Sequence, residues 1–350
     1  MYKNLRCGVI GLGGISATHT GAYLQCPRAE LYAICDSSPS WLAFAQKKFN
    51  TPKAYVDYRE LLADPDIDAV SICLPTGLHA EVTVAALNAG KHVLCEKPMA
   101  INADEARQMR DAAVRNDKKL MISQNQRFDQ NVQLMKRRVD EGFFGDLYFV
   151  RIAWRRPTGM MPGPDAVREN GEHYSRNWFN EKDNGGGVLR DLGCHLLDLT
   201  MYIADFPKLI SADARCYRKF FPDGYKPGAF VCDSEDLATA HIKFENGLTV
   251  QLEVSFGSHV ESEVVVTDLY GTKGGASRFG GDGTLTFFRD DDAGNAIAES
   301  VTRYAQPYIG TQSRFVDSVL DDLPVPIPAE EGIQVIEALD AIYQSAAVIL

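Results

Sequence analysis

The chain has 350 residues, 45% of them hydrophobic and 24% charged, which is an ordinary composition for a globular protein. The formal net charge of -11 and the lack of a Lys/Arg-rich run argue against nucleic acid as a partner. No apolar segment reaches the ~18 residues of a membrane span, so we expect no membrane partner, and the length favours two domains.

The N-terminus and the cysteines indicate a reducing compartment. MYKNLRCGVIGLGG runs directly from a strand into a glycine turn, which is not the pattern of a secretory signal peptide. The eight cysteines form no CxxC pair, and Cys7, Cys35, Cys73 and Cys95 lie in apolar runs typical of buried free thiols. We therefore expect a cytoplasmic protein.

The first segment of the chain matches a dinucleotide-binding fingerprint. A strand over 5–10 leads into GLGGIS, then a helix, then a strand over 31–35 that ends in Asp36. Gly11 permits the tight turn, and Gly13 lets the backbone approach a pyrophosphate at the helix N-terminus. The third glycine position holds Ser16, which is small enough for close helix–strand packing.

Asp36 also bears on the choice of cofactor. A carboxylate there accepts hydrogen bonds from the adenosine ribose hydroxyls and repels a 2′-phosphate. Ser37 and Ser38 supply no arginine to neutralise such a phosphate, so the sequence favours NAD. NADP stays possible, because the serines can donate hydrogen bonds to a phosphate.

Strands and helices alternate up to residue 123. We predict helices over 41–49, 58–62, 80–89 and 102–116, and strands over 69–74, 92–95 and 120–123. This order predicts a doubly wound parallel sheet, in which ligands bind beyond the carboxyl ends of the strands. Gly11, Asp36, Pro75, Lys97 and Asn125 then share one edge. Lys97 lies between a buried strand and a proline, where it either serves the site or pairs with Glu96.

The stretch GGGVLRDLGCHLLD, residues 185–198, holds the second candidate group. It predicts a helix with Asp191 and His195 four residues apart on one face. Such a pair is either a hydrogen-bonded pair in the core or part of an active site beside a cofactor. We expect the glycines at the start of this stretch to make room for substrate or cofactor. Zinc would need further ligands that the sequence does not show, so we expect no metal.

After residue 123 the strict alternation stops. We predict a helix over 131–141, a strand over 147–154, and a loop over 158–184 that either covers a substrate pocket or packs its own aromatic residues. Further strands are predicted over 209–220, 237–245, 248–256 and 260–269, and helices over 315–320 and 333–348. The last helix is expected to pack near the first domain.

The motifs GVIGLGGISATH, LPTGLHAEVTVAALNAGKHVLCEKPMA, QNQRF and GGGVLRDLGCHLLDL resemble, in order and spacing, the Gfo/Idh/MocA oxidoreductases. The resemblance implies an α/β protein: an N-terminal Rossmann domain over 1–124 with a doubly wound parallel sheet, and a C-terminal α/β domain over 125–350. The second domain is expected to carry a large open, mainly antiparallel sheet, through which the chain forms a homodimer or homotetramer.

The resemblance also implies roles for single residues. Lys97, Asp191 and His195 are the expected catalytic residues, with His195 as the acid/base. The expected cofactor-binding residues are Gly11, Gly13, Gly14, Ile15, Asp36, Ser37, Leu74, Pro75, Thr76, His79, Glu96, Lys97 and Asn125. Arg127, Arg155, Tyr174 and Trp178 are expected to bind substrate.

These residues predict NAD(P)-dependent oxidation of a secondary alcohol on a sugar or cyclitol, such as an inositol-like polyol or an aldose. An imidazole with a pKa near ~6.5 suits the general base, and a lysine cation stabilises a developing alkoxide. Two alternatives remain: a non-catalytic NAD(P)-binding sugar sensor, and an NAD-dependent glycosidase on the same fold. Retention of Lys97, Asp191 and His195 argues against the sensor.

Overall fold

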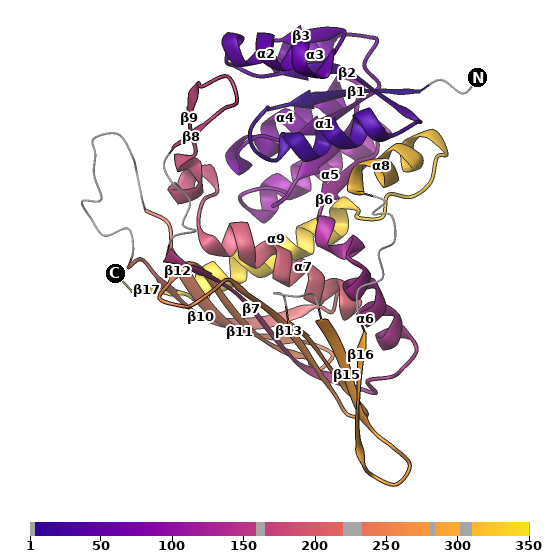
Figure 1. Ribbon diagram of the computed structural model, residues 1–350, viewed down its shortest axis with the longest axis vertical. Helices are drawn as coiled ribbons and strands as arrows, with labels where there is room; N and C mark the ends of the chain where they lie inside the picture. Colours follow the sequence, from indigo (N-terminus) through magenta and orange to yellow (C-terminus); the bar gives the residue numbers. More distant parts are fainter. Residues whose placement is uncertain (1–3, 159–164, 220–232, 280–283, 302–309, 350) are drawn as a thin grey trace.

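A computed structural model describes residues 4–158, 165–219, 233–279, 284–301 and 310–349 (Figure 1). It contains a parallel sheet in the first third of the chain and a larger, mainly antiparallel sheet in the rest. Helices lie between the two sheets in Figure 1. The predicted fold class is therefore confirmed.

The first sheet has six strands in the order β3-β2-β1-β4-β5-β6, and every neighbouring pair is parallel. Its strands are β1 (Leu5–Ile10), β2 (Ala29–Cys35), β3 (Lys53–Tyr55), β4 (Ala69–Ile72), β5 (His92–Glu96) and β6 (Leu120–Ser123). Its helices are α1 (Ser16–Gln25), α2 (Pro39–Phe49), α3 (Tyr58–Ala63), α4 (His79–Asn88) and α5 (Ala103–Arg115). Helices on both faces bury the central strands, which is why these read as continuous apolar runs.

The second sheet has nine strands in the order β16-β15-β14-β13-β7-β12-β11-β10-β17. They are β7 (Leu147–Pro157), β10 (Leu209–Tyr217), β11 (Leu237–Phe244), β12 (Thr249–Ser258), β13 (Val264–Gly271), β14 (Gly275–Phe279), β15 (Thr284–Asp290), β16 (Ala296–Val301) and β17 (Ala347–Ile349). The pairs β7–β12 and β10–β17 are parallel, and the other neighbours are antiparallel.

One face of this sheet packs on helices. Figure 1 shows α7 (Cys194–Ile203) and α9 (Ala329–Ser345) lying along it, with α6 (Gln130–Asp140) at one side. In β11, Ala238, Ala240, Ile242 and Phe244 are buried, and the residues between them are half-buried or exposed. This alternation is typical of a sheet with one covered face.

The last helices return to the first sheet. α8 (Thr311–Leu320) lies against α1, where Arg28 pairs with Asp317 at 2.5 Å. α9 packs on α5, where Asp340 accepts a hydrogen bond of 3.0 Å from the backbone N–H of Ala103. The division of the chain at residues 124 and 125 stays a prediction.

The segment 158–184 is more ordered than a loop. In its described part it forms a hairpin of β8 (Asp165–Val167) and β9 (His173–Ser175), followed by short 3-10 turns at Asn177–Asn180 and Lys182–Asn184. The sequence analysis also missed β3, β14, β15, β16 and β17, and its last helix, predicted to reach residue 348, ends at Ser345. Among the described residues, no helix is long and apolar enough to cross a membrane.

Candidate active site

The turn after β1 has the geometry of a pyrophosphate cradle. Gly11 has φ +88, and a Cβ there would lie 2.6 Å from the carbonyl oxygen of Cys73, so glycine is required. Among the described residues, and apart from chain neighbours, no atom lies within 4 Å of a Cβ built on Gly13 or Gly14. α1 begins with no side-chain cap, and Ile15 before it is 40% exposed. Open space at a helix start that lacks a side-chain cap fits a bound pyrophosphate.

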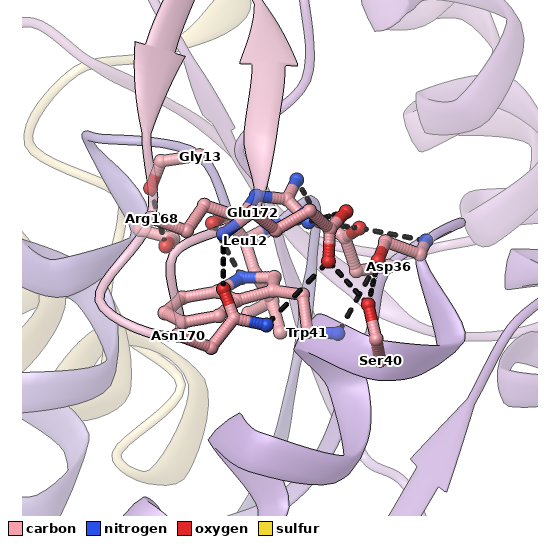
Figure 2. Close-up of polar contacts among 10 residues, drawn as sticks. Leu12, Gly13, Asp36, Ser40, Trp41, Arg168, Asn170 and Glu172 are labelled. Atoms are coloured by element: carbon pink, nitrogen blue, oxygen red, sulfur yellow. Dashed lines mark hydrogen bonds and ion pairs between the residues drawn. The ribbon is translucent and has the colours of Figure 1, made fainter.

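Asp36 is fixed at the end of β2. Its Oδ2 accepts from the Leu12 N–H at 3.0 Å, and its Oδ1 accepts from the Ser38 N–H at 3.0 Å (Figure 2). Ser37 between them is exposed. The carboxylate is therefore placed beside the glycine turn, as ribose recognition requires. Arg168 of the hairpin also contacts it, which the sequence did not indicate.

His79 joins the loop after β4 to the loop after β5. Its Nδ1 lies 2.8 Å from the Pro98 carbonyl oxygen, and its Nε2 lies 2.9 Å from the Leu74 carbonyl oxygen. Burial lowers the pKa of this imidazole, and a neutral ring donates to one of the two carbonyls. Pro75 is half-buried and Thr76 is buried in the same loop.

Glu96 is buried and belongs to a hydrogen-bonded chain that the sequence reading missed. His19 Nε2 lies 2.9 Å from Glu96 Oε1, and His19 Nδ1 lies 2.9 Å from Ser71 Oγ, which also contacts the Tyr23 hydroxyl at 2.7 Å. Burial raises the pKa of Glu96, but His19 and Lys97 outweigh burial and lower it. His19 and Tyr23 are four residues apart on α1, a spacing that places both on its buried face.

Lys97 pairs with Asp191. Its Nζ lies 2.8 Å from Asp191 Oδ1 and 3.2 Å from the Asp191 carbonyl oxygen, and each side chain is 16% exposed. Burial alone lowers the pKa of Lys97, but the Asp191 carboxylate reverses this and raises it, so the lysine stays cationic. Glu96 reaches only the backbone N–H of Lys97, at 3.2 Å, so the alternative Glu96 salt bridge does not form.

A π-helical turn separates the two groups that the sequence placed on one helix face. Asp191 lies in that turn, Leu189–Gly193, and His195 lies in the first turn of α7. A π turn re-aims side chains and is frequent at functional sites. Asp191 faces Lys97, so the pair is not a core His–Asp pair.

His195 is neutral and buried. Its ring lies 5.9 Å from the Trp154 ring, and its Nδ1 has no hydrogen-bond partner within the described residues. Burial, and then the charges of Lys97 and Arg156, lower its pKa well below 6.5. An imidazole that is unprotonated at neutral pH has a free ring nitrogen that can accept a proton.

The sequence suggested that the glycines before this helix make room for substrate or cofactor. In the structure the chain's own side chains fill that space. A Cβ on Gly185 would lie 2.7 Å from Thr76 Cβ, and one on Gly187 would lie 2.4 Å from Glu235 Oε1. Both have positive φ, of +78 and +110. They are required because the chain's own side chains pack against them.

Arg127 forms ion pairs within the protein, which does not favour the substrate-binding role expected from the sequence. It is 1% exposed, and its Nε and Nη2 donate to the Asp198 carboxylate at 2.8 Å and 2.5 Å. It also donates to Glu331. The guanidinium therefore ties α7 and α9 to the segment after β6, with three of its five N–H groups donating to carboxylates of the protein.

The substrate prediction for Arg155 falls on the wrong face of β7. Alternation along the strand puts Trp154 and Arg156 on the side of His195, and Arg155 on the opposite side, where its Nε lies 3.7 Å from Glu253 Oε1. Arg156 Nε donates to Glu263 at 2.9 Å and its guanidinium lies 5.1 Å from the Trp154 ring. Arg156 is the arginine of this strand that faces the site.

The remaining predicted residues lie apart from one another. Tyr174, on β9, lies with Arg168 beside Asp36, the carboxylate that the sequence assigns to the adenosine ribose. Trp178 is half-buried and stacks on Phe179 with ring centroids 3.8 Å apart. Asn125 is exposed directly after β6. Within the described residues, no cluster of three or more His, Cys, Asp or Glu could hold a metal ion.

Comparison with known proteins agrees with this geometry. Residues 5–124 match the oxidoreductase family with an NAD-binding Rossmann fold, and residues 132–277 match the GFO/IDH/MocA C-terminal domain. The chain is 29% identical over 353 residues to D-glucoside 3-dehydrogenase of Escherichia coli, covering 98% of this chain and 95% of that protein. It is 28% identical over 356 residues to myo-inositol 2-dehydrogenase of Thermotoga maritima, covering 94% and 92%.

Solved structures show the same architecture. An oxidoreductase domain protein from Kribbella flavida aligns with a TM-score of 0.86 at 25% identity, over 98% of this chain and 97% of that one. A levoglucosan dehydrogenase in complex with NADH aligns with a TM-score of 0.85 at 25% identity, again over 98% and 97%.

Proposed function

Because the chain belongs to the Gfo/Idh/MocA oxidoreductase family, we propose that it oxidises a secondary alcohol of a sugar or cyclitol reversibly, with NAD(P) as cofactor. The observation that carries this proposal is the placement of a cationic Lys97, paired with Asp191 at 2.8 Å, and a neutral His195 that is in the field of that cation. The relatives named above act on a glucoside, an inositol and levoglucosan, which supports a polyhydroxylated substrate.

The chain's own residues supply the proton chemistry. Neutral His195 accepts the proton of the reacting hydroxyl group, and the Lys97 ammonium donates a hydrogen bond to the oxygen as negative charge develops on it. Asp191 keeps Lys97 charged and fixes its Nζ. NAD, when bound, supplies the hydride acceptor, and Gly11, Gly13, Gly14 and Asp36 would hold its pyrophosphate and ribose.

A substrate screen tests the proposal. Inositols, aldoses and simple glycosides are incubated with NAD or NADP, and reduced cofactor is followed by absorbance. Accumulation of NADH or NADPH with at least one polyol, without bond cleavage, is the expected result. Hydrolysis of a glycoside with the cofactor returned unchanged would instead indicate a glycosidase, and binding of sugar and cofactor without turnover would indicate a sensor.

We also propose that the uncovered face of the nine-stranded sheet joins copies of this chain into a dimer or tetramer. Apolar side chains on it are exposed, with Tyr270 at 38%, Phe279 at 52% and Phe288 at 44%. Light scattering on the wild type and on Phe279→Ser tests this, with a shift toward monomer expected in the variant.

We also propose a cytoplasmic location on the basis of composition, and the free thiols of the described cysteines support it.

A further inference from the structure

The β8–β9 hairpin delivers an arginine to the ribose-binding carboxylate. Arg168 Nη1 lies 3.2 Å from Asp36 Oδ1, and Arg168 Nη2 lies 3.3 Å from Asp36 Oδ2 (Figure 2). The two residues are 132 positions apart in the chain. Their side chains are only 10% and 7% exposed, so the pair is not a loose surface contact.

The arginine is held from several sides. Its guanidinium lies 5.4 Å from the Trp41 ring and 4.9 Å from the Tyr174 ring, and Trp41 Nε1 donates to the Leu12 carbonyl oxygen at 3.0 Å. The hairpin is fastened further out, where the Ser40 hydroxyl donates to Glu172 and Lys48 pairs with Glu169. These contacts fix the plane and the position of the guanidinium.

Arg168 takes the acceptor positions that the ribose of NAD needs. A carboxylate offers about four lone-pair sites. The N–H groups of Leu12 and Ser38 occupy two of them, and the two Arg168 nitrogens occupy the other two. The 2′- and 3′-hydroxyl groups of NAD would have to displace Arg168 in order to donate to Asp36.

The same pair favours a 2′-phosphate. Arg168 neutralises the Asp36 charge that would repel it. The Nε–H of Arg168 is buried without an acceptor among the described residues, and by covalent geometry it shares one edge of the guanidinium with Nη2. Such an edge donates two parallel hydrogen bonds to two phosphate oxygens. Glu172 lies near the other side of the group, 3.5 Å from Nη1.

We propose that Arg168 sets the nucleotide preference of this site, shifting it from NAD toward NADP by covering Asp36 and offering its Nε–Nη2 edge to the 2′-phosphate. This inference rests on the proposed function, because it assumes that the glycine turn binds a nicotinamide dinucleotide. Asp36 alone predicts NAD, whereas Asp36 paired with Arg168 also accepts NADP.

Binding measurements with the whole protein test the proposal without a known substrate. Dissociation constants of NADH and NADPH are measured by nicotinamide fluorescence for the wild type and for Arg168→Gln. The ratio of the NADPH constant to the NADH constant is expected to rise by roughly 10- to 100-fold, the effect of one or two charge-assisted hydrogen bonds. Arg168→Lys keeps the charge but loses the fork, so a smaller rise is expected.

Lys48→Gln is the matched control. It removes the ion pair with Glu169 at the hairpin tip and leaves Arg168 on Asp36, so the ratio is expected to stay unchanged. On the wild type, adenosine 2′,5′-bisphosphate is expected to displace NADPH at lower concentration than 5′-AMP does. Because this displacement measurement uses only the wild type, it tests the proposal even if Arg168→Gln does not fold.

Four results would overturn the inference. If Arg168→Gln bound NADH and NADPH more weakly by the same factor, the arginine would stabilise both cofactors without discrimination. If it bound both more tightly by the same factor, the arginine would only compete with the ribose for Asp36. Equal displacement by the two adenosine probes would show no recognition of a 2′-phosphate. In these three cases the proposed function stands, whereas a wild type that binds neither NADH nor NADPH would refute both.

Discussion

Lys97 Nζ lies 2.8 Å from Asp191 Oδ1, so the lysine after β5 and the acid of the π turn form one functional unit. Asp191→Asn keeps the shape of the pair and removes its negative charge. Burial then lowers the pKa of Lys97 with only Cys194 and Glu96 left to oppose it, and the ammonium group loses its charged hydrogen-bond partner. We expect kcat to fall by roughly 100-fold, in the range for a lost electrostatic group. An unchanged kcat, with NADH binding normal, would contradict the role assigned to Asp191.

His195→Gln removes the general base. Loss of such a group reduces the rate by roughly 10²–10⁴-fold, and because His195 is not at the dinucleotide turn, the NADH dissociation constant is expected to hold. In the wild type, alcohol oxidation is lost only as pH falls through the lowered pKa of His195, so kcat/KM should stay flat across pH 6.5. A pH profile with its acid limb centred above 6.5 would refute this assignment.

Arg127→Met leaves the Asp198 carboxylate buried and unpaired. Breaking a buried pair from one side costs about 3–5 kcal/mol, so the free energy of unfolding, measured with urea, is expected to drop by that amount. Arg110→Met is the control, because Arg110 pairs with its neighbour Asp111 at the surface, and such changes alter stability by less than ~0.5 kcal/mol. Similar losses in the two variants would show that Arg127 is not the tie between α7 and α9.

His92 makes stability depend on pH. Its Nδ1 accepts from the Lys119 N–H at 3.1 Å, and burial, then Lys118 and Lys119, lower its pKa to about 4 from 6.5. Between these values the unfolded chain binds a proton that the folded chain does not, so stability falls as pH drops from 6.5 toward 4. His92→Asn keeps an acceptor without a titrating group, and it should flatten the melting temperature against pH. An equal slope in both proteins would exclude His92 as the cause.

Gly11→Ala and Gly14→Ala separate folding from cofactor binding. The first forces a Cβ to 2.6 Å from the Cys73 carbonyl oxygen at a positive φ, so a lower melting temperature is expected. The second adds a methyl group to open space, so stability should hold while NADH binding weakens. Calorimetry and fluorescence titration measure the two effects. Normal NADH binding by Gly14→Ala would place the pyrophosphate elsewhere.

Five of the six strands of the first sheet were predictable, because each leaves a strong local pattern, whereas β3, with three half-buried residues, was not predicted. An apolar run, a glycine turn and Asp36 follow one another within one βαβ unit, and all three lie where the fingerprint places them. β16 left no such pattern, because Ala296 to Ser300 are exposed and no buried face imposes alternation. Edge strands of this kind are recognised by their pairing, which sequence periodicity does not report.

The sequence pointed to some residues of the candidate site but not to the pairs that they form. Lys97, Asp191 and His195 were found from motif spacing, but the π turn that sends Asp191 to Lys97 has no periodic signal. Arg156 was missed because the predicted strand stopped at 154, and continuing the alternation two residues would have found it. Arg168 meets Asp36 only through tertiary contact.

The return of the chain's end to the first sheet has a consequence for synthesis. β6 is an edge strand, and its outer side is closed by residues near the end of the chain: the Ile122 N–H donates to the Ile327 carbonyl oxygen at 3.2 Å, and Met121 bridges Pro328. While the ribosome is still translating the second sheet, that edge has no partner and is open to pairing with another nascent chain. The dinucleotide half is therefore synthesised before the second sheet, but its sheet edge is covered only after the second sheet has been synthesised.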